Sequence, residues 1–287
     1  MTDVKFKMDP ITGKYVYVTY NQKEYRIYFE EAGSGIPLVC LHTAGADSRE
    51  WRHQLCDPDI TNNFRIIAFD LPRHGRSIPP ANWYKEIDEY KLTSKFYSGL
   101  IMAFCDALDL DKPVIMGSSM GGHVCLHLAL HYENRLRALI AIEACERTPS
   151  VVGFVDWLSH PEINGIEAIA TRMLGLMAPQ SPEEYRWETW WYYAQGGPGI
   201  FKGDLYFYSI DHDFREHCDK ISGKVPMYFL SGMYDFSCAP EMAEQTANKV
   251  KGSRYTLMED VGHFPMSENP SVFKKYLMPI LKEIMQT

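Results

Sequence analysis

Short apolar runs alternate with helical patterns along most of the chain, and this alternation constrains the fold more than any other feature. Runs at 37–41, 65–69 and 113–116 are too short for helices and too continuous for a half-exposed sheet. Further strands are predicted at 138–142, 226–230 and 254–258, and helices at 48–55, 88–108, 120–131 and 271–285. Such alternation implies parallel strands joined by crossover helices. We therefore predict the α/β class, with a mostly parallel central sheet and helices on both faces.

Two segments depart from this alternation. Residues 14–20 and 24–30 are rich in Tyr and Val, with a turn predicted at 21–23, which indicates an antiparallel hairpin at the start. Residues 147–224 contain no clear strand but do contain helical patterns such as 165–177. We interpret this segment as an inserted helical lid, or cap domain, on a core made of 1–146 and 225–287.

Composition excludes several classes of protein. The 287 residues are 46% apolar and 23% charged, as in ordinary globular proteins, and the net charge of −8 disfavours binding to nucleic acid or acidic lipid. Charges interrupt the first ten residues, so we expect no export signal, and no apolar stretch reaches the roughly 20 residues of a membrane span. Seven cysteines form no C-x-x-C pair. We expect reduced thiols and a cytoplasmic location.

The sequence Gly-Ser-Ser-Met-Gly at 117–121 lies between a predicted strand and a predicted helix, which is the context that a G-x-S-x-G nucleophile elbow requires. Its central residue is Ser119. A nucleophile on so tight a turn adopts a strained backbone, and side chains two residues away on either side would collide with neighbouring segments. The start of the helix also favours developing negative charge. Ser119 is therefore the candidate nucleophile.

From about residue 33 to its end the chain resembles the α/β-hydrolase family, which places an acid after a later strand and a histidine after the last strand. Asp235 and His263 occupy these two positions. The resemblance thus implies a catalytic triad of Ser119, Asp235 and His263. Two other acids compete with Asp235: Glu143 lies where some family members carry an alternative acid, and Asp260 is three residues from His263 and is better placed to shape the turn.

The resemblance also implies an oxyanion hole. One amide would come from Met120 and the other from the loop His-Thr-Ala-Gly-Ala at 42–46, where we assign Ala44. The family usually has glycine at the position of Thr43, which leaves open whether Thr43 or Ala44 supplies this amide. His42 and the loop at 73–77 match positions that the family uses structurally.

The implied chemistry is acyl transfer through a covalent intermediate on Ser119. A serine at the elbow, where alkyl-enzyme chemistry of the dehalogenase or epoxide hydrolase kind needs an aspartate, favours the carbonyl branch. We predict a hydrolase of carboxylic esters or lactones. One alternative is a carbon–carbon bond hydrolase of ring-cleavage diketones, although Ser118 stands where that subfamily usually has Asn. Another is a receptor with the hydrolase fold that binds a small apolar ligand.

The predicted lid suggests the substrate. Ten of the 24 residues at 185–208 are aromatic, against 13% in the whole chain, so part of the lid is expected to wall an apolar pocket over the nucleophile. Arg172 or Arg186 would pair one carboxylate there. The expected partner is a small apolar ester or lactone.

We expect no metal or cofactor. His123, His127 and His131 follow one another at four-residue steps, a spacing that binds zinc in some helices, but no H-E-x-x-H motif or close cysteine pair accompanies them. No glycine-rich phosphate loop is present either.

Overall fold

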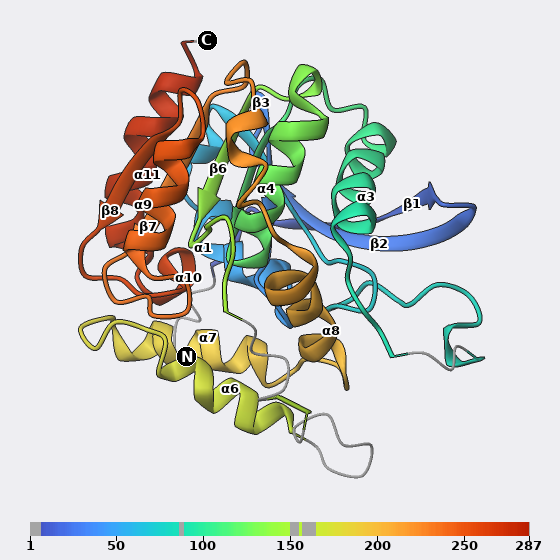
Figure 1. Cartoon of the computed structure of the whole chain (residues 1–287). Coiled ribbons are helices and arrows are strands. Elements are labelled where there is room, and N and C mark those ends of the chain that lie inside the picture. Colours follow the sequence, from blue (N-terminus) through green and yellow to red (C-terminus); the bar gives the residue numbers. More distant parts are fainter. Residues whose placement is uncertain (1–6, 86–88, 150–154, 157–164, 287) are drawn as a thin grey trace.

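The computed structural model describes residues 7–85, 89–149, 155–156 and 165–286. Its centre is one eight-stranded sheet in the order β1-β2-β4-β3-β5-β6-β7-β8 (Figure 1). The strands are β1 (Thr12–Tyr20), β2 (Lys23–Ala32), β3 (Ile36–Leu41), β4 (Phe64–Phe69), β5 (Val114–Ser118), β6 (Ala138–Ile142), β7 (Met227–Gly232) and β8 (Arg254–Met258). β1 and β2 pair antiparallel, β2 pairs antiparallel with β4, and the remaining pairs are parallel. The predicted class and sheet are confirmed.

The central strands are the most apolar part of the chain and are buried. Every residue of β5 and β6 is buried, and Val39 of β3 lies in register with Ile115 of β5. Helices cover the sheet on both sides, which removes both faces of these strands from water. This burial explains why the strands appear in the sequence as continuous apolar runs.

Helices before and after the cap segment complete the core. They are α1 (Arg52–Leu55), α2 (Pro58–Thr61), α3 (Ser94–Ala107), α4 (Met120–His131), α9 (Pro240–Lys249), α10 (Pro265–Glu268) and α11 (Pro270–Ile284), with short 3-10 turns η1 (Ser48–Trp51), η2 (Trp83–Lys85) and η3 (Glu133–Arg135). α3 packs beside α4, whereas α1 contacts α10, which contacts α11. None of the helices in the described ranges has the length and apolar character that a membrane crossing requires.

Two predicted boundaries were wrong. The helix predicted from residue 88 begins at Ser94, because the Thr93 hydroxyl caps it by accepting from the Phe96 amide at 3.3 Å; residue 88 itself lies outside the described residues. The hairpin turn contains two residues instead of three. Asn21 and Gln22 both have positive φ, as in a tight hairpin turn, and Lys23 already belongs to β2.

The described part of 147–224 is helical and contains no strand. It comprises α6 (Ile166–Leu174), α7 (Glu183–Tyr193) and α8 (Ile200–Tyr206), followed by a π-helical turn η5 (Phe207–Asp211) and a 3-10 turn η6 (Cys218–Lys220). In Figure 1 α6, α7 and α8 lie together at one end of the sheet. Loops that follow the parallel strands meet these helices around one cavity. The division into a core and a separate cap domain stays an interpretation.

Candidate active site

Ser119 occupies the tight turn between β5 and α4. Its backbone has φ 56° and ψ −118°, in the positive-φ region that side chains rarely adopt. The Ser119 amide donates to the Ile142 carbonyl at 2.9 Å, which fixes the turn against β6. A Cβ atom at Gly117 would collide with the Gly121 carbonyl, and one at Gly121 would lie 2.7 Å from the Leu41 carbonyl. Both glycines are therefore required for this turn, as the motif predicts.

The structure brings His263 and Asp235 into direct contact. Asp235 follows β7 and His263 follows β8, so neighbouring parallel strands deliver both side chains to the same edge of the sheet. His263 Nδ1 lies 2.7 Å from Asp235 Oδ2. Asp235 Oδ1 accepts from the amides of Ser237 at 2.7 Å and Cys238 at 3.2 Å, which fixes the carboxylate.

Burial and charge oppose each other in this pair. Burial alone would raise the pKa of Asp235, but the neighbouring His263 charge and the hydrogen bonds hold that pKa below its ordinary value. Burial likewise would lower the pKa of His263, and the Asp235 carboxylate more than offsets it, so the pKa is raised. The pair therefore holds an ionised Asp235 against an imidazole that accepts a proton readily.

Neither alternative acid contacts His263. The Glu143 side chain is buried, and its Oε1 accepts from the Gly232 amide at 2.7 Å. Burial, together with the Asp235 charge, raises the pKa of Glu143 well above its ordinary value, which favours its neutral form. Asp260 instead accepts from the Gln180 side chain at 2.8 Å. Glu143 is therefore a neighbour of Asp235 and not a partner of His263. Asp260 joins the turn before His263 to the segment before α7.

Two amides of the loop at 42–46 donate to buried carboxylates, and the residue between them lines the cavity. The Thr43 amide donates to Glu50 Oε2 at 2.8 Å, and the Gly45 amide donates to Asp204 Oδ2 at 2.8 Å. Ala44, between them, lines the same cavity as Ser119. Met120 begins α4 directly after Ser119, where helix amides lack intrahelical partners. These contacts favour Ala44 over Thr43 as the source of the second amide.

A buried hydrogen-bond group explains the threonine at position 43. The Thr43 hydroxyl donates to Glu50 Oε1 at 2.6 Å and also contacts the Tyr193 hydroxyl of α7. Glu50 is fully buried in η1, and burial raises its pKa to about 7. Thr43 thus ties the loop to the core and to the cap segment, which a glycine would not do.

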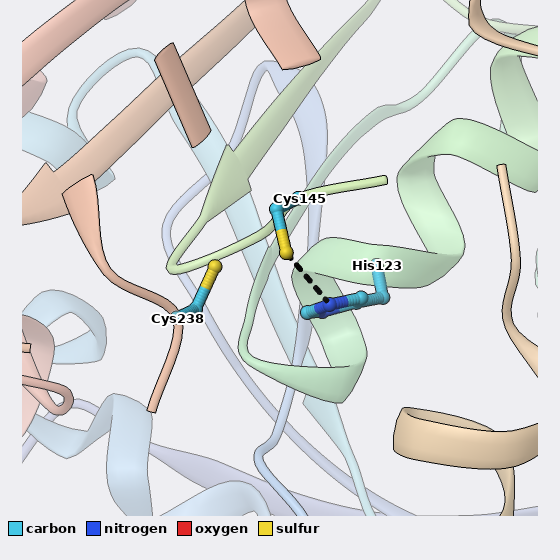
Figure 2. A group of neighbouring side chains, drawn as sticks. All are labelled: His123, Cys145 and Cys238. Carbon is cyan, nitrogen blue, oxygen red and sulfur yellow. Dashed lines mark hydrogen bonds between the residues drawn. The ribbon is translucent and has the colours of Figure 1, made fainter. Parts of the chain in front are cut away.

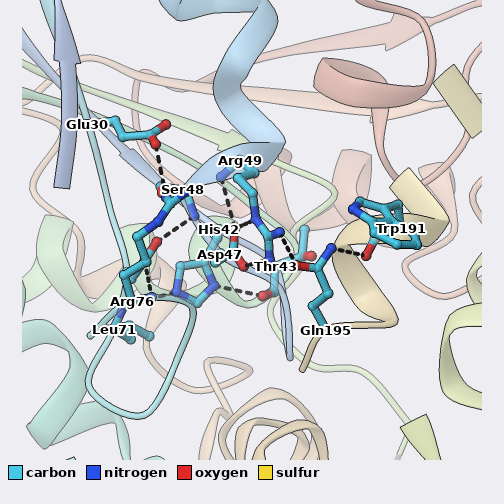
Figure 3. A network of polar contacts seen from close by, with 11 residues as sticks. Glu30, His42, Thr43, Asp47, Ser48, Arg49, Leu71, Arg76, Trp191 and Gln195 are labelled. Atoms are coloured by element: carbon cyan, nitrogen blue, oxygen red, sulfur yellow. Dashed lines mark hydrogen bonds and ion pairs between the residues drawn. The ribbon is translucent and has the colours of Figure 1, made fainter. Parts of the chain in front are cut away.

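His42 and the loop that contains His74 have structural contacts, shown in part in Figure 3. His42 Nδ1 donates to the Thr43 carbonyl at 2.9 Å, and Nε2 accepts from the Leu71 amide at 3.2 Å. Burial lowers the pKa of His42 to about 4, so the ring is neutral. Arg49 of η1, which follows the loop at 42–46, binds Asp47 and donates to Gln195 at 2.6 Å. This contact links η1 to the end of α7.

Two buried acids that the sequence analysis did not identify accept hydrogen bonds from the loops that carry the candidate site residues. Asp204 of α8 accepts from the Gly45 amide and lies 2.8 Å from His74 Nε2. Glu268 of α10 accepts from the amides of Gly262 and Phe264, on either side of His263, and from Ala178 in the cap segment. Burial raises the pKa of Glu268 to about 7. The signal in the sequence for Asp204 was an acid between Gly203 and Leu205 in a stretch that is mostly apolar.

Ser119 and His263 line a cavity of about 160 Å³ together with Ala44. The cap segment supplies most of the remaining wall, which is largely apolar: Arg172, Met173, Leu176, Tyr193, Phe201, Leu205 and Tyr208. Three of the aromatic residues predicted to wall a pocket do so, whereas the side chains of Trp187 and Trp191 are exposed. Arg172 reaches the cavity and Arg186 is not part of its lining.

The three histidines of α4 point to different partners. His123 Nδ1 donates to the Ser119 carbonyl at 2.7 Å, and His127 Nε2 lies 3.1 Å from His212 Nδ1. The His131 side chain is exposed at the end of the helix. The four-residue spacing therefore does not bring the three rings to one point.

Known proteins share this fold and sequence pattern. A sequence model of the alpha/beta hydrolase family matches residues 38–275. The chain belongs to the alpha/beta hydrolase family. The bifunctional epoxide hydrolase 2 of Rattus norvegicus is 23% identical over 309 residues, which cover 91% of this chain and 54% of that protein. A 2-hydroxy-6-oxononadienedioate/2-hydroxy-6-oxononatrienedioate hydrolase of Burkholderia vietnamiensis is 29% identical over 153 residues, covering 52% of this chain and 51% of that protein.

The chain thus spans about half the length of the curated relatives it matches. Among solved structures, a thermophilic esterase from Thermogutta terrifontis superimposes with a TM-score of 0.81 at 22% identity. That match covers 95% of this chain and 99% of the esterase. It shows that the two proteins share the fold.

Proposed function

We propose that this protein is a serine hydrolase that cleaves a carboxylic ester or lactone with an apolar portion. The observation that carries the proposal is the meeting of Ser119, at a strained elbow, and the His263–Asp235 pair at one cavity. Nucleophile, base and orienting acid in this relation are the requirements for covalent acyl transfer.

The proposed reaction begins with proton transfer from Ser119 to His263 Nε2, while Ser119 Oγ attacks the substrate carbonyl carbon. The amides of Ala44 and Met120 stabilise the oxyanion that forms. His263 then gives its proton to the leaving alcohol, and water, activated by the same imidazole, releases the acid and restores Ser119. Asp235 keeps the Nδ1 proton of His263 in place, which leaves Nε2 free to act as the base.

The cavity supports a small apolar acyl or alkoxy group. Met173, Leu176 and Phe201 offer no hydrogen-bond donors in their side chains, so a sugar-like acyl group that lies against them would lose its hydration without compensation. Excluding water also strengthens the interaction between the amides and the oxyanion. The cap segment is thereby proposed to act in both selection and catalysis.

A carbon–carbon bond hydrolase is the second candidate. It is favoured by the relatives named as 2-hydroxy-6-oxononadienedioate hydrolases and by Arg172 at the cavity, since a guanidinium pairs well with a substrate carboxylate. The relatives named as epoxide hydrolases give weaker support for epoxide hydrolysis, because that chemistry needs an aspartate at the elbow and the residue here is Ser119. A receptor that binds without turnover is the non-enzymatic alternative.

A substrate panel tests these proposals. We expect multiple turnover on short aryl and alkyl esters or lactones, a loss of about 10⁶-fold in kcat for Ser119→Ala, and near-normal turnover for the neighbouring control Ser118→Ala. Rapid bleaching of a coloured dienoic diketone with little ester turnover would establish the second candidate. Ester turnover that survives Ser119→Ala would refute the mechanism, and tight ligand binding without turnover would establish the receptor.

A further inference from the structure

Three side chains with soft metal-binding atoms meet behind the substrate cavity. His123 lies on α4, Cys145 follows β6 and Cys238 follows β7 (Figure 2). All three side chains are fully buried. One ligand atom from each, a ring nitrogen or a sulfur, lies within 4.8 Å of the other two. The topology brings these residues together from distant parts of the sequence.

The orientation of His123 suits a metal ligand. Its Nδ1–H donates to the Ser119 carbonyl at 2.7 Å, so the Nε2 lone pair is available, and it lies 3.9 Å from Cys145 Sγ. Histidines that bind metals almost always donate their other ring N–H to a carbonyl or carboxylate, which fixes the tautomer and the ring orientation. The Ser119 carbonyl already provides that contact here.

We propose that His123, Cys145 and Cys238 form a binding site for one thiophilic divalent cation of the zinc class. Two thiolates and a neutral imidazole neutralise a charge of +2, so the bound site adds no net charge to the interior. With Zn–S bonds of about 2.3 Å, tetrahedral geometry separates two sulfurs by about 3.8 Å. Ligand atoms that now lie within 4.8 Å must therefore approach by about 1 Å at most, through small rotations of two loop cysteines.

Three protein ligands leave a fourth coordination position for water or a small molecule. Binding would release the protons of both thiols, as metal binding to cysteine requires. The site adjoins the substrate cavity, because Tyr208 and Ser237 line that cavity and are hydrogen-bonded to each other at 3.1 Å. The Tyr208 ring packs on His123 at 4.6 Å, and Ser237 precedes Cys238 in the chain.

Backbone contacts connect the site to the catalytic residues. His123 contacts the Ser119 carbonyl, and the Cys238 amide donates to Asp235 at 3.2 Å. Movement of His123 toward a cation would therefore shift its contact with the elbow, and movement of Cys238 would shift its contact with Asp235. The proposal is independent of the hydrolase mechanism, because binding is measured without any substrate.

Cadmium titration of the reduced, metal-free full chain tests the site. We expect the thiolate-to-cadmium charge-transfer band to saturate at one equivalent and to be displaced by Zn²⁺. Cys145→Ser and Cys238→Ser should each lower the plateau to roughly half or weaken binding more than tenfold. The control Cys125→Ser removes a buried thiol that is not a proposed ligand and lies on α4. This variant should titrate like the unmodified protein. A band that fails to saturate, or one unchanged in both cysteine variants, would overturn the proposal.

Two further measurements keep the test independent of how well the variants fold. Zn²⁺ should raise the Tm of the unmodified chain and of Cys125→Ser, but not of the two cysteine-ligand variants, because only a cation that binds the folded state stabilises it. Anomalous diffraction from cadmium-soaked crystals of the unmodified chain should place the ion between the three ligands. Cadmium bound elsewhere, with this position empty, would contradict the assignment.

Discussion

Replacing Asp235 and Glu143 by their amides, one at a time, distinguishes the roles of two neighbouring buried acids. In Asp235→Asn, Oδ1 keeps the Ser237 and Cys238 amides, so the new NH₂ group faces His263 Nδ1 in place of a carboxylate oxygen. It donates to Nδ1 and forces the proton onto Nε2, the nitrogen that must accept from Ser119. This wrong tautomer costs about 10⁴-fold in kcat, which corresponds to about 5.4 kcal/mol of transition-state stabilisation.

Glu143→Gln is the matched control. The glutamine oxygen accepts from the Gly232 amide as Oε1 does now, and the amide adds no charge beside Asp235. This hydrogen bond is therefore preserved, and we expect kcat within a few-fold of the unmodified protein. The assay is kcat and KM on a short aryl ester, with a thermal melt of each variant. A loss in Glu143→Gln as large as that in Asp235→Asn, or a loss under tenfold in Asp235→Asn, would refute this reasoning.

Three further predictions concern the surroundings of the triad. Because Asp235 outweighs burial and raises the pKa of His263, kcat/KM should rise with pH through a pKa above about 6.5. In Asp235→Asn, which removes the largest effect that opposes burial, the limb should move to lower pH; an unmoved limb in the pH profile would contradict this. Asp204→Asn leaves His74 without its buried partner and should lower the free energy of unfolding by about 3–5 kcal/mol in urea titrations. The exposed control Asp59→Asn should leave the free energy of unfolding almost unchanged, and equal losses in the two variants would argue against the buried pair. Glu268→Gln puts an NH₂ group against amides that need an acceptor and should cost about 1–3 kcal/mol, with kcat falling more than KM rises. A change in KM alone would remove Glu268 from the positioning of His263.

The sequence was sufficient for the elements whose pattern is local. Continuous apolar runs identified the parallel strands because both faces of the sheet are covered. The two glycines identified the elbow because Gly117 lies too close to the Gly121 carbonyl, and Gly121 too close to the Leu41 carbonyl, for any side chain to fit. The strands and the elbow follow from periodicity and from steric limits on the backbone. Asp235 and His263 were instead expected from the resemblance to the family, and the pairing of β7 with β8 places both at one edge of the sheet.

Contacts between distant segments could not be predicted in the same way. Nothing in the sequence around Glu143 shows that its carboxyl accepts from the Gly232 amide and does not contact His263. The roles of Asp204 and Glu268 depend on amides supplied by other loops. The error at the start of α3 has a local cause: the helical pattern begins before residue 94, but the Thr93 cap makes the helix begin at Ser94.

Covalent labelling tests the central claim most directly. A fluorophosphonate reacts with a serine only where a base removes the hydroxyl proton and an oxyanion site receives the phosphonyl oxygen. Intact-mass and peptide analysis should find one adduct per chain, on Ser119, formed at a normal rate in Ser118→Ala and abolished in His263→Ala. An unlabelled chain, or a label on another residue with Ser119 unmodified, would contradict the account.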